Sequence, residues 1–67
     1  MIVVRALVLF DYHAVDFDEL TVFAGDVVSN VEGDEGFNGW VRVDIDDRQG
    51  FIPECYLAYL GDPETQV

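Results

Sequence analysis

The chain has 67 residues, and its 14 acidic side chains outnumber three arginines to give a net charge of −11. This length fits one small domain whose core is too thin for a large active-site cavity. The negative charge repels phosphate backbones and anionic lipid head groups, so the composition excludes nucleic-acid binding and direct membrane binding and favours basic partners.

The compartment is indicated by the cysteine content and by the N-terminal residues. Cys55 is the single cysteine, whereas small secreted domains ordinarily carry several paired cysteines. The apolar start of the chain is too short for a secretory signal and is interrupted by Arg5, and no apolar run approaches membrane-spanning length. We therefore expect a cytoplasmic protein.

Short runs of β-branched and aromatic residues, bounded by turn residues, predict five strands and no long helix. The strands are predicted at residues 2–10, 27–31, 40–45, 49–53 and 57–60. Residues 12–19 form a long acidic loop, residues 32–39 form a loop rich in glycine and acid, and residues 54–56 fit one short helical turn. Small all-β chains avoid open strand edges by closing, so the pattern predicts a small barrel or an orthogonal sandwich.

Alternation of apolar and polar residues predicts which side chains face the core. In the first strand, Ala6 and Val8 share one face and Leu7 and Leu9 share the other, and which face is inward is left open. The side chains expected to point inward are Leu20, Val22, Val41, Val43 and Ile45. Trp40 has the opposite phase from the last three of these residues, so its ring is expected on the outer surface. Tryptophan is more often buried, and this phase therefore favours a binding role over a core role.

The end of the chain differs in composition from the rest. Residues 61–67 are polar and contain glycine and proline, which predicts a flexible tail behind a domain of residues 1–60. The ending Glu64-Thr65-Gln66-Val67 fits the C-terminal motif that PDZ domains capture by strand addition, provided that Val67 is the natural C-terminus. A chance match in a fragment is the competing explanation, and we favour it.

The most distinctive stretch begins with Val8-Leu9-Phe10-Asp11-Tyr12 and continues into the acidic run Asp16-Phe17-Asp18-Glu19-Leu20. Aromatic residues belong in a core, yet here they stand where the chain leaves its first strand. Aromatic rings beside a dense negative patch indicate a surface for a ligand with apolar rings and a positive charge. A solvated loop is the alternative for the acids, because acidic residues are ordinary in loops.

Five segments of the chain, in the same order and spacing, resemble the motifs of the Src homology 3 (SH3) domain family. The segments are Val8-Leu9-Phe10-Asp11-Tyr12, Asp18-Glu19-Leu20-Thr21-Val22, Ala24-Gly25-Asp26, Gly39-Trp40 and Gly50-Phe51-Ile52-Pro53-Glu54-Cys55-Tyr56-Leu57. They are similar to the family's Ala-Leu-Tyr-Asp-Tyr and Asp-Glu-Leu-Ser-Phe motifs, its Gly-Asp turn, its Gly-Trp pair and its Gly-x-x-Pro-x-x-Tyr-Val motif. The resemblance implies an all-β fold, a small five-stranded SH3-like barrel with one short 3-10 turn before the last strand.

The resemblance also implies a non-catalytic module of an intracellular adaptor, signalling or scaffold protein. Such a module binds proline-rich segments in the polyproline II conformation, and PxxP-type segments with a basic residue are the expected ligands. The residues that the resemblance assigns to this peptide-binding site are Phe10, Tyr12, Asp16, Asp18, Glu19, Trp40, Phe51, Pro53 and Tyr56. We expect a monomer without a cofactor; the ligand's orientation, the partner and the parent protein are left open.

Three positions depart from the family pattern. Phe10 stands where tyrosine is usual and Cys55 stands where asparagine is frequent, so two polar contacts to the ligand are absent at one end of the site. Each lost contact costs on the order of 1 kcal/mol of binding free energy. Asn30 stands where an apolar core residue is common, so it is expected either to turn outward at a bulge or to find a buried partner.

Other polar residues lack the companions that catalysis or metal binding requires. His13 and Cys55 have no further ligands at a recognisable spacing. Asp46 and Asp47 stand in a predicted hairpin turn, where aspartate is favoured by turn geometry. We therefore expect neither enzyme activity nor a metal site.

A structural or self-associating domain, which docks a folded partner or its own parent chain, is the alternative function. Phe17 is expected to be exposed at the loop tip, where it either contacts a ligand residue outside the proline core or packs on its own loop. Phe23, with Val15, is a candidate for a second apolar patch, although single exposed apolar residues are ordinary.

Overall fold

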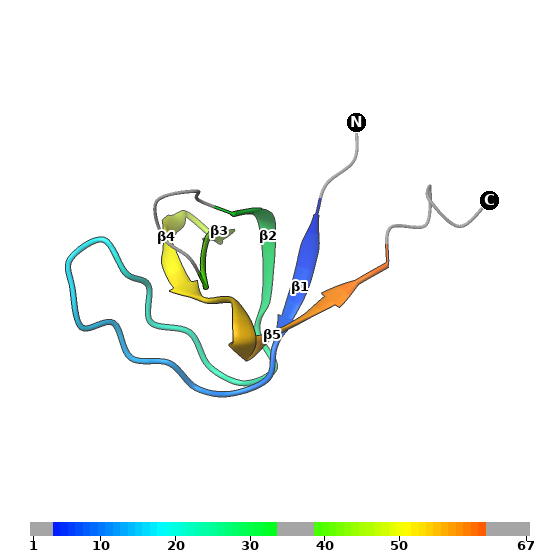
Figure 1. Cartoon of the computed structure of the whole chain (residues 1–67), viewed down its shortest axis with the longest axis horizontal. Helices are drawn as coiled ribbons and strands as arrows, with labels where there is room; N and C mark the ends of the chain where they lie inside the picture. The colour runs from blue at the N-terminus through cyan, green and yellow to red at the C-terminus, as the bar shows by residue number, and fades with distance from the viewer. Residues whose placement is uncertain (1–3, 34–38, 62–67) are drawn as a thin grey trace.

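The computed structural model describes residues 4–33 and 39–61, which form a five-stranded sheet and one short helical turn. The strands are β1 (Arg5–Val8), β2 (Val27–Gly33), β3 (Trp40–Ile45), β4 (Arg48–Pro53) and β5 (Leu57–Leu60) (Figure 1). A 3-10 helix, η1 (Glu54–Tyr56), separates β4 from β5. The five strands and the short turn before the last strand confirm the fold class expected from the sequence.

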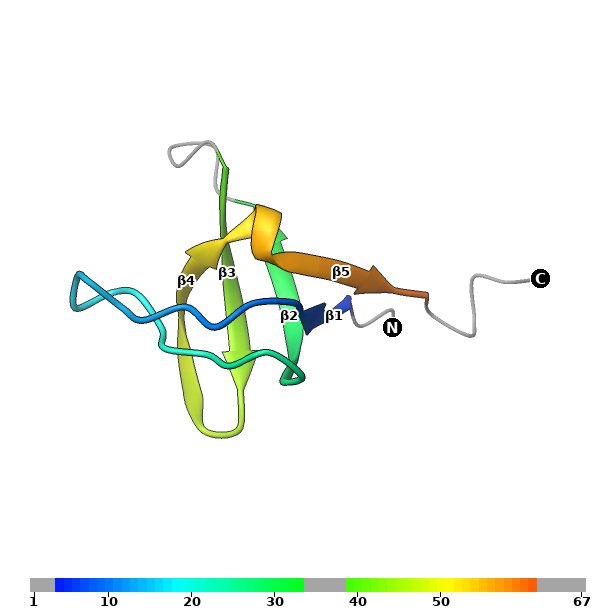
Figure 2. The same ribbon diagram turned by 90° about the horizontal axis from the view of Figure 1, so that it is seen from below.

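The sheet has the strand order β4-β3-β2-β1-β5, and each pair of neighbours is antiparallel. Strand β5 runs at a steep angle to β2, β3 and β4, so the sheet is not flat (Figure 2). Among the described residues, no helix is long and apolar enough to cross a membrane.

Several predicted boundaries shift by one or two residues, and some lie outside the described ranges. β1 ends at Val8 rather than at Phe10, because the chain becomes exposed there and leaves the sheet. β2 continues to Gly33, into the segment expected to begin the second loop. The expected start of the first strand at residue 2, residues 34–38 of the second loop and residues 62–67 of the tail lie outside the described part of the chain.

The core consists of apolar side chains contributed by all five strands and by the loop between β1 and β2. The buried residues are Ala6, Val8, Leu20, Val22, Val28, Val31, Val41, Val43, Ile52 and Leu57. They include every residue predicted to face inward except Ile45, which is half-buried and packs against this core at the end of β3. Removal of this apolar surface from water is the main stabilising contribution to a fold of this size.

β2 contains an irregularity at Asn30. Its pairing with β3 shifts register between Ser29 and Glu32, and Asn30 has a φ of 52°, in the left-handed region that asparagine tolerates. The irregularity leaves the side chain exposed, and its Nδ2 donates a hydrogen bond to Oδ2 of Asp44 at 2.8 Å. Asn30 therefore turns outward at a bulge, the first of the two expectations for this residue.

β3 and β4 form a hairpin with a tight turn at Asp46 and Asp47. The two strands stay paired to Ile45 and Arg48, on either side of the turn, so β4 begins one residue earlier than expected. Asp46 has a φ of 52°, a conformation that aspartate reaches more readily than most residues. The predicted hairpin and the turn role of this acidic pair are confirmed.

Residues 9–26 form a long arm that projects from the end of β1 and returns to β2 (Figures 1 and 2). At its base, the amide of Val8 donates a hydrogen bond to the carbonyl of Asp26 at 2.8 Å. Further out, Tyr12 and Val22 exchange two backbone hydrogen bonds at 2.8 and 2.9 Å. Because Val22 is fully buried, this pair of hydrogen bonds fixes the arm to the core and holds the backbone of Tyr12 in place beside it.

Candidate functional site

Four aromatic side chains form a continuous row on the surface. The ring centroid of Tyr56 lies 5.7 Å from the ring centroid of Phe10 and 5.7 Å from that of Tyr12. Those of Tyr12 and Trp40 lie 5.9 Å apart, and all three pairs meet edge to face. Phe10 is 59% exposed and the other three residues are half-buried, so the row is open to a ligand.

The row is assembled from segments that are far apart in the sequence. Trp40 begins β3, and its ring is directed outward because the next residue, Val41, is buried in the core. Pro53 pairs with Trp40 in the β3–β4 ladder, and the amide of Glu54 donates to the carbonyl of Gly39 at 2.9 Å. These contacts hold η1, and with it Tyr56, beside the start of β3.

An acidic pocket of about 190 Å³ opens at the Trp40 end of the row. It is lined by Asp16, Asp18 and Glu19 from the arm and by Trp40 and Phe51 from the sheet. One carboxylate oxygen from each of the three acids lies within 4.8 Å of the others. Negative charge and aromatic surface therefore meet in one small hollow, which suits a side chain with an apolar stem and a cationic end.

Hydrogen bonds to Glu19 set the protonation of this pocket. Oε1 of Glu19 accepts from the Tyr12 hydroxyl at 2.5 Å and from the amide of Val15 at 2.9 Å. The bond from Tyr12 holds the pKa of Glu19 below its usual range, and the same bond raises the pKa of Tyr12 to about 12. The charge of Glu19 in turn raises the pKa of Asp16. At neutral pH the pocket is negative and the Tyr12 hydroxyl keeps its proton.

The acidic segment of the arm is docked on β4 by backbone contacts. The amide of Leu20 donates to the carbonyl of Phe51, and the amide of Phe51 donates to the carbonyl of Asp18, both at 3.0 Å. Gly50 is buried beneath this contact, and a Cβ at this position would lie 3.0 Å from the Asp18 carbonyl oxygen. Gly50 was noted in the sequence only as part of the Gly-x-x-Pro motif, although a glycine inside a strand is a signal of close backbone approach.

Two further polar residues hold the arm rather than face a ligand. Oδ1 of Asp11 accepts a hydrogen bond from the amide of Ala24 at 2.8 Å, and the Thr21 hydroxyl oxygen accepts one from the amide of Ala14 at 3.0 Å. Asp11 stands between the two aromatic residues that drew attention in the sequence. The carboxylate of Asp11 thus links the two sides of the arm instead of adding to the acidic pocket.

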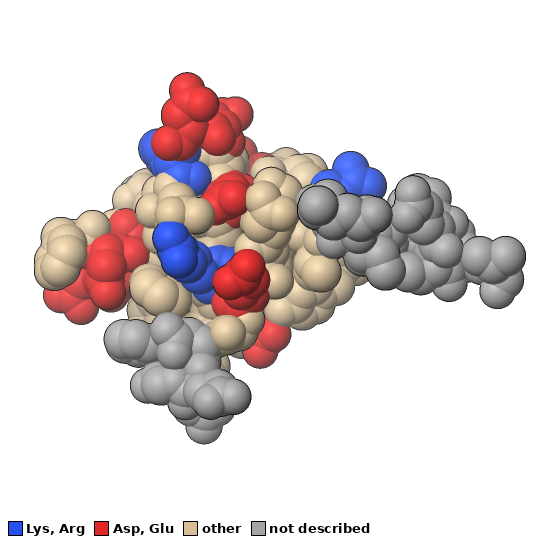
Figure 3. Space-filling view, turned by 90° about the horizontal axis from the view of Figure 1, so that it is seen from above, with Lys and Arg blue, Asp and Glu red and all other residues tan. Residues whose placement is uncertain are grey.

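A second hollow, of about 170 Å³, lies over the β2–β3–β4 sheet. In it, Asp44 accepts hydrogen bonds from Asn30 and Gln49, both at 2.8 Å, and Arg42 donates to Gln49. The bonds from Asn30 and Gln49 lower the pKa of Asp44. Acidic and basic side chains are mixed on this face (Figure 3), so its charges are partly compensated, unlike those of the acidic pocket.

The domain is expected to be most stable at mildly acidic pH. Because the pKa of Asp16 is raised above 3.8, the folded state takes up this proton before the unfolded chain as the pH falls, and stability rises. Because the pKa of Glu19 is lowered below 4.5, stability is lost again at lower pH. Melting temperatures at about pH 7, 5 and 3.5 test this, and a steady fall in melting temperature from pH 7 downward would contradict it.

Added salt at neutral pH is also expected to raise the melting temperature, because it screens the net charge of −11.

The structure places eight of the nine residues that the resemblance assigned to the site in the aromatic row or the acidic pocket, which share Trp40. The ninth, Pro53, is half-buried and pairs with Trp40 in the β3–β4 ladder. Phe10 and Cys55 are both exposed, as expected for residues at one end of this surface. Phe23 is 50% exposed and packs edge to face on His13 at 5.9 Å, so it is partly covered within the arm. The binding roles of the assigned residues stay predictions.

Known proteins with similar sequences share the same type of domain. A sequence profile described as SH3 domain matches residues 7–54. The chain is 38% identical over 57 residues, 85% of its length, to SH3 domain-containing kinase-binding protein 1 of Mus musculus. It is 40% identical over 52 residues, 78% of its length, to proline-serine-threonine phosphatase-interacting protein 1 of the same species. The chain spans 8% and 12% of the length of these two relatives.

Solved structures show the same arrangement of strands. The C-terminal SH3 domain of myosin IB from Entamoeba histolytica, crystallised with a bound peptide, matches with a TM-score of 0.80 and 27% sequence identity. That match covers 90% of this chain and 97% of the other. A further crystal structure of the same domain matches with a TM-score of 0.77 and 26% identity, covering 87% of this chain and 93% of the other.

Proposed function

Because this chain belongs to the SH3 domain family, whose members are non-catalytic protein–protein interaction modules, we propose that it binds proline-rich segments that carry a basic residue. The observation that carries the proposal is the row of aromatic rings that ends at an acidic pocket. The peptide bound to the similar myosin IB domain supports it. The chain accounts for a small part of its relatives' length, so the module would act within a larger intracellular adaptor or scaffold.

The row of rings suits a polyproline II helix. This helix has three residues per turn and no internal hydrogen bonds, so its prolines project as ridges that fit between rings. Phe10 and Tyr56 would wall one groove, and the second groove would lie among Tyr12, Trp40 and Pro53, with Tyr56 shared. The indole N–H of Trp40 would donate to a ligand carbonyl.

The acidic pocket would receive the basic residue of the ligand. An arginine side chain presents its guanidinium to a carboxylate through two parallel hydrogen bonds, which a lysine ammonium does not match. Arginine is therefore the better fit to Asp16, Asp18 and Glu19. A few proline contacts and a largely exposed ion pair give a binding free energy of roughly −6 to −8 kcal/mol, which corresponds to a dissociation constant in the micromolar range.

Amide-shift titration tests the proposal directly. Isotope-labelled protein is titrated with proline-rich peptides that carry arginine at either end. Shifts that cluster at the row and the pocket support the proposal, and the preferred peptide gives the ligand orientation. The residues to follow are Phe10, Tyr12, Asp18, Glu19, Trp40 and Tyr56. If no peptide shifts the amide signals of these residues, the proposal fails. The same samples, examined by sedimentation, test the expectation that the domain is a monomer.

The charge of Glu19 is expected to matter most for basic ligands. Glu19→Lys should weaken an arginine-containing peptide by about tenfold, because it replaces an attraction with a repulsion at a partly exposed site. For the same peptide with alanine in place of arginine, Glu19→Lys should lower the affinity much less. Isothermal titration of both peptides provides the measurement.

Glu19→Gln is the matched control, because its amide oxygen can still accept hydrogen bonds from Tyr12 and Val15. A modest loss of about twofold to fivefold is expected for the arginine peptide alone. Equal losses for both peptides would show that Glu19 supports the arm and does not contact the basic residue.

A further inference from the structure

Tyr59 lies in β5, the strand at one edge of the sheet, and is not a member of the aromatic row. It pairs with Ala6 of the core in the β1–β5 ladder, and because paired side chains share a face, its ring stands on the core side of β5. The side chain is 51% exposed, yet its hydroxyl donates a hydrogen bond to Oε2 of Glu54 at 2.5 Å. Partial burial and this bond raise the pKa of Tyr59 to about 12, so the hydroxyl keeps its proton at neutral pH.

Glu54 is the first residue of η1, and it is hydrogen-bonded through three different groups. Its amide donates to the carbonyl of Gly39 at 2.9 Å, and its carbonyl accepts from the amide of Leu57. Its carboxylate accepts the bond from Tyr59. The backbone bonds hold the two ends of η1, and the side-chain bond adds a tie from η1 to a position further along β5.

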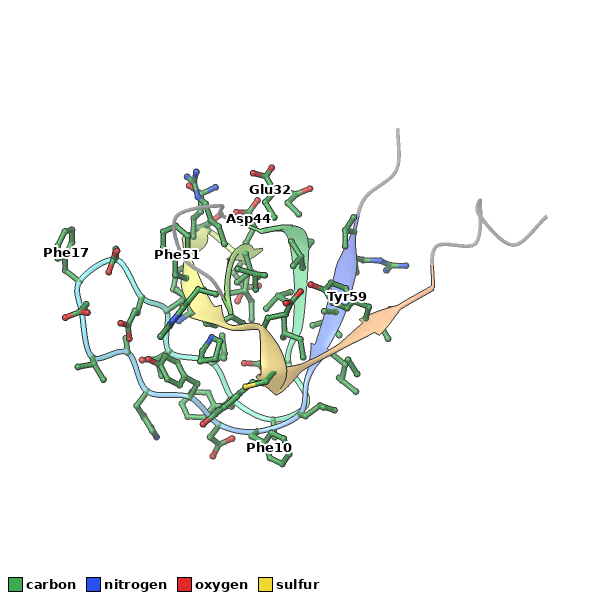
Figure 4. The ribbon with its side chains drawn as sticks, viewed as in Figure 1. Phe10, Phe17, Glu32, Asp44, Phe51 and Tyr59 are labelled. Atoms are coloured by element: carbon green, nitrogen blue, oxygen red, sulfur yellow. The ribbon has the colours of Figure 1, made fainter. Side chains whose placement is uncertain are left out.

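The third residue of η1 is Tyr56, whose ring stands between Phe10 and Tyr12 in the aromatic row and meets both edge to face. In the view of Figure 4, Tyr59 and Phe10 lie on opposite sides of this short turn. Because η1 is a single tight turn of three residues, a displacement of Glu54 at its start also displaces Tyr56 at its end. The placement of the Tyr56 ring therefore depends on a bond made on the far side of η1.

The acidic pocket does not share these contacts. Neither Tyr59 nor Glu54 lines it, and its own Glu19 is held by Tyr12 and Val15. The two halves of the site are thus held by separate hydrogen bonds. Because two polar contacts usual in the family are absent at the Phe10 end, recognition there depends on how the rings are placed.

We infer that Tyr59 is a positioning residue which, through Glu54, holds Tyr56 in place for the first proline groove. This inference rests on the proposed function and deepens it, because it makes the fit to proline adjustable without a change in the pocket for the basic residue. Tyr59 itself would not contact the ligand.

Tyr59→Phe removes only the hydroxyl and is the substitution that tests the inference. It should weaken an arginine-containing proline-rich peptide and its alanine counterpart by the same factor, about threefold, because both peptides use the groove. Glu19→Gln, by contrast, is expected to weaken the arginine peptide alone. Isothermal titration of both peptides measures the losses, and denaturant unfolding corrects them for the folded fraction of each variant.

Substitutions at Glu54 show whether Tyr59 acts through this residue. Glu54→Gln keeps an oxygen that can accept from the Tyr59 hydroxyl and should bind both peptides as wild type does. Glu54→Ala should reproduce the loss seen in Tyr59→Phe. The double variant Tyr59→Phe/Glu54→Ala should lose no more affinity than Glu54→Ala alone, since both substitutions remove the same bond.

The ring-proton signals of the free domain provide a measurement that needs no ligand. In Tyr59→Phe the signals of Phe10 should shift, because the ring of Tyr56 meets that of Phe10 edge to face. Phe17 is the internal reference, since its side chain extends from the outer end of the arm at 102% exposure (Figure 4) and its signals should stay in place.

The outcomes separate this inference from the proposed function. If wild type binds the peptides but Tyr59→Phe leaves both affinities and the Phe10 signals unchanged, the inference is wrong and the proposed function stands. A loss confined to the arginine peptide, or additive losses in the double variant, would overturn the inference in the same way. If neither peptide binds wild type, the proposed function and the inference fail together.

Discussion

Trp40→Ala is expected to abolish binding of proline-rich peptides and to leave the domain folded. Trp40 belongs to both halves of the site, since its ring contacts Tyr12 in the aromatic row and lines the acidic pocket with Phe51. Its removal opens the second proline groove and removes one wall of the pocket. A tryptophan at the centre of an interface typically contributes 2 kcal/mol or more, so we expect a loss of about 30-fold or greater.

The fold is expected to survive because Trp40 lies outside the core. The core side chain at this end of β3 is the neighbouring Val41, which is buried and is untouched by the substitution. Calorimetry with an arginine-containing peptide measures the loss of affinity, and the amide spectrum of the free variant reports its fold. Trp40→Phe serves as the control, because it keeps a ring and should recover part of the affinity. An unfolded Trp40→Ala variant would show that this residue is structural.

Alternation predicted the core best in the middle of the strands. Val41 and Val43 are buried as their phase requires, because they belong to the core to which all five strands and the arm contribute. Ile45 has the same phase but is only half-buried, since it stands at the last position of β3 beside the hairpin turn. Asn30 departs from the pattern because a positive φ is a property of the backbone that a hydrophobic period does not encode.

The sequence showed which types of residue make up the site. It did not show which of them face a ligand and which hold the arm in place. The aromatic and acidic residues stood together, but their assignment to one peptide-binding site came from the resemblance to SH3 motifs. Glu19 was assigned to the ligand, yet one of its oxygens is occupied by Tyr12 and Val15. Such contacts join residues across a folded loop, so no local sequence pattern reveals them.

Gly50→Ala is expected to destabilise the domain and to weaken basic ligands together. The new methyl group would lie 3.0 Å from the carbonyl oxygen of Asp18 and 3.2 Å from Cβ of Leu20. Neither neighbour yields easily, because Leu20 is part of the core and the chain on both sides of Glu19 is hydrogen-bonded to Phe51. Overpacking of this kind costs about 1 to 3 kcal/mol of folding free energy.

The effect on binding follows from what lies above Gly50. If the arm moves outward to admit the methyl group, Asp18 and Glu19 move with it, and both line the acidic pocket. The affinity for an arginine peptide should then fall more than the affinity for its alanine counterpart, whereas a purely global loss of stability would lower both equally once the folded fraction is corrected. Denaturant unfolding and calorimetry of the two peptides separate these cases.

Gly33→Ala is the matched control for this substitution. Gly33 also lies in a strand, and a Cβ added there would have no neighbour within 4 Å, so the change tests the loss of glycine without the steric conflict. We expect its stability and both affinities to stay close to those of the wild type. A Gly50→Ala variant that matches Gly33→Ala in stability and in peptide preference would show that the arm tolerates displacement. The close contact with β4 would then not be what holds the carboxylates of the pocket in place.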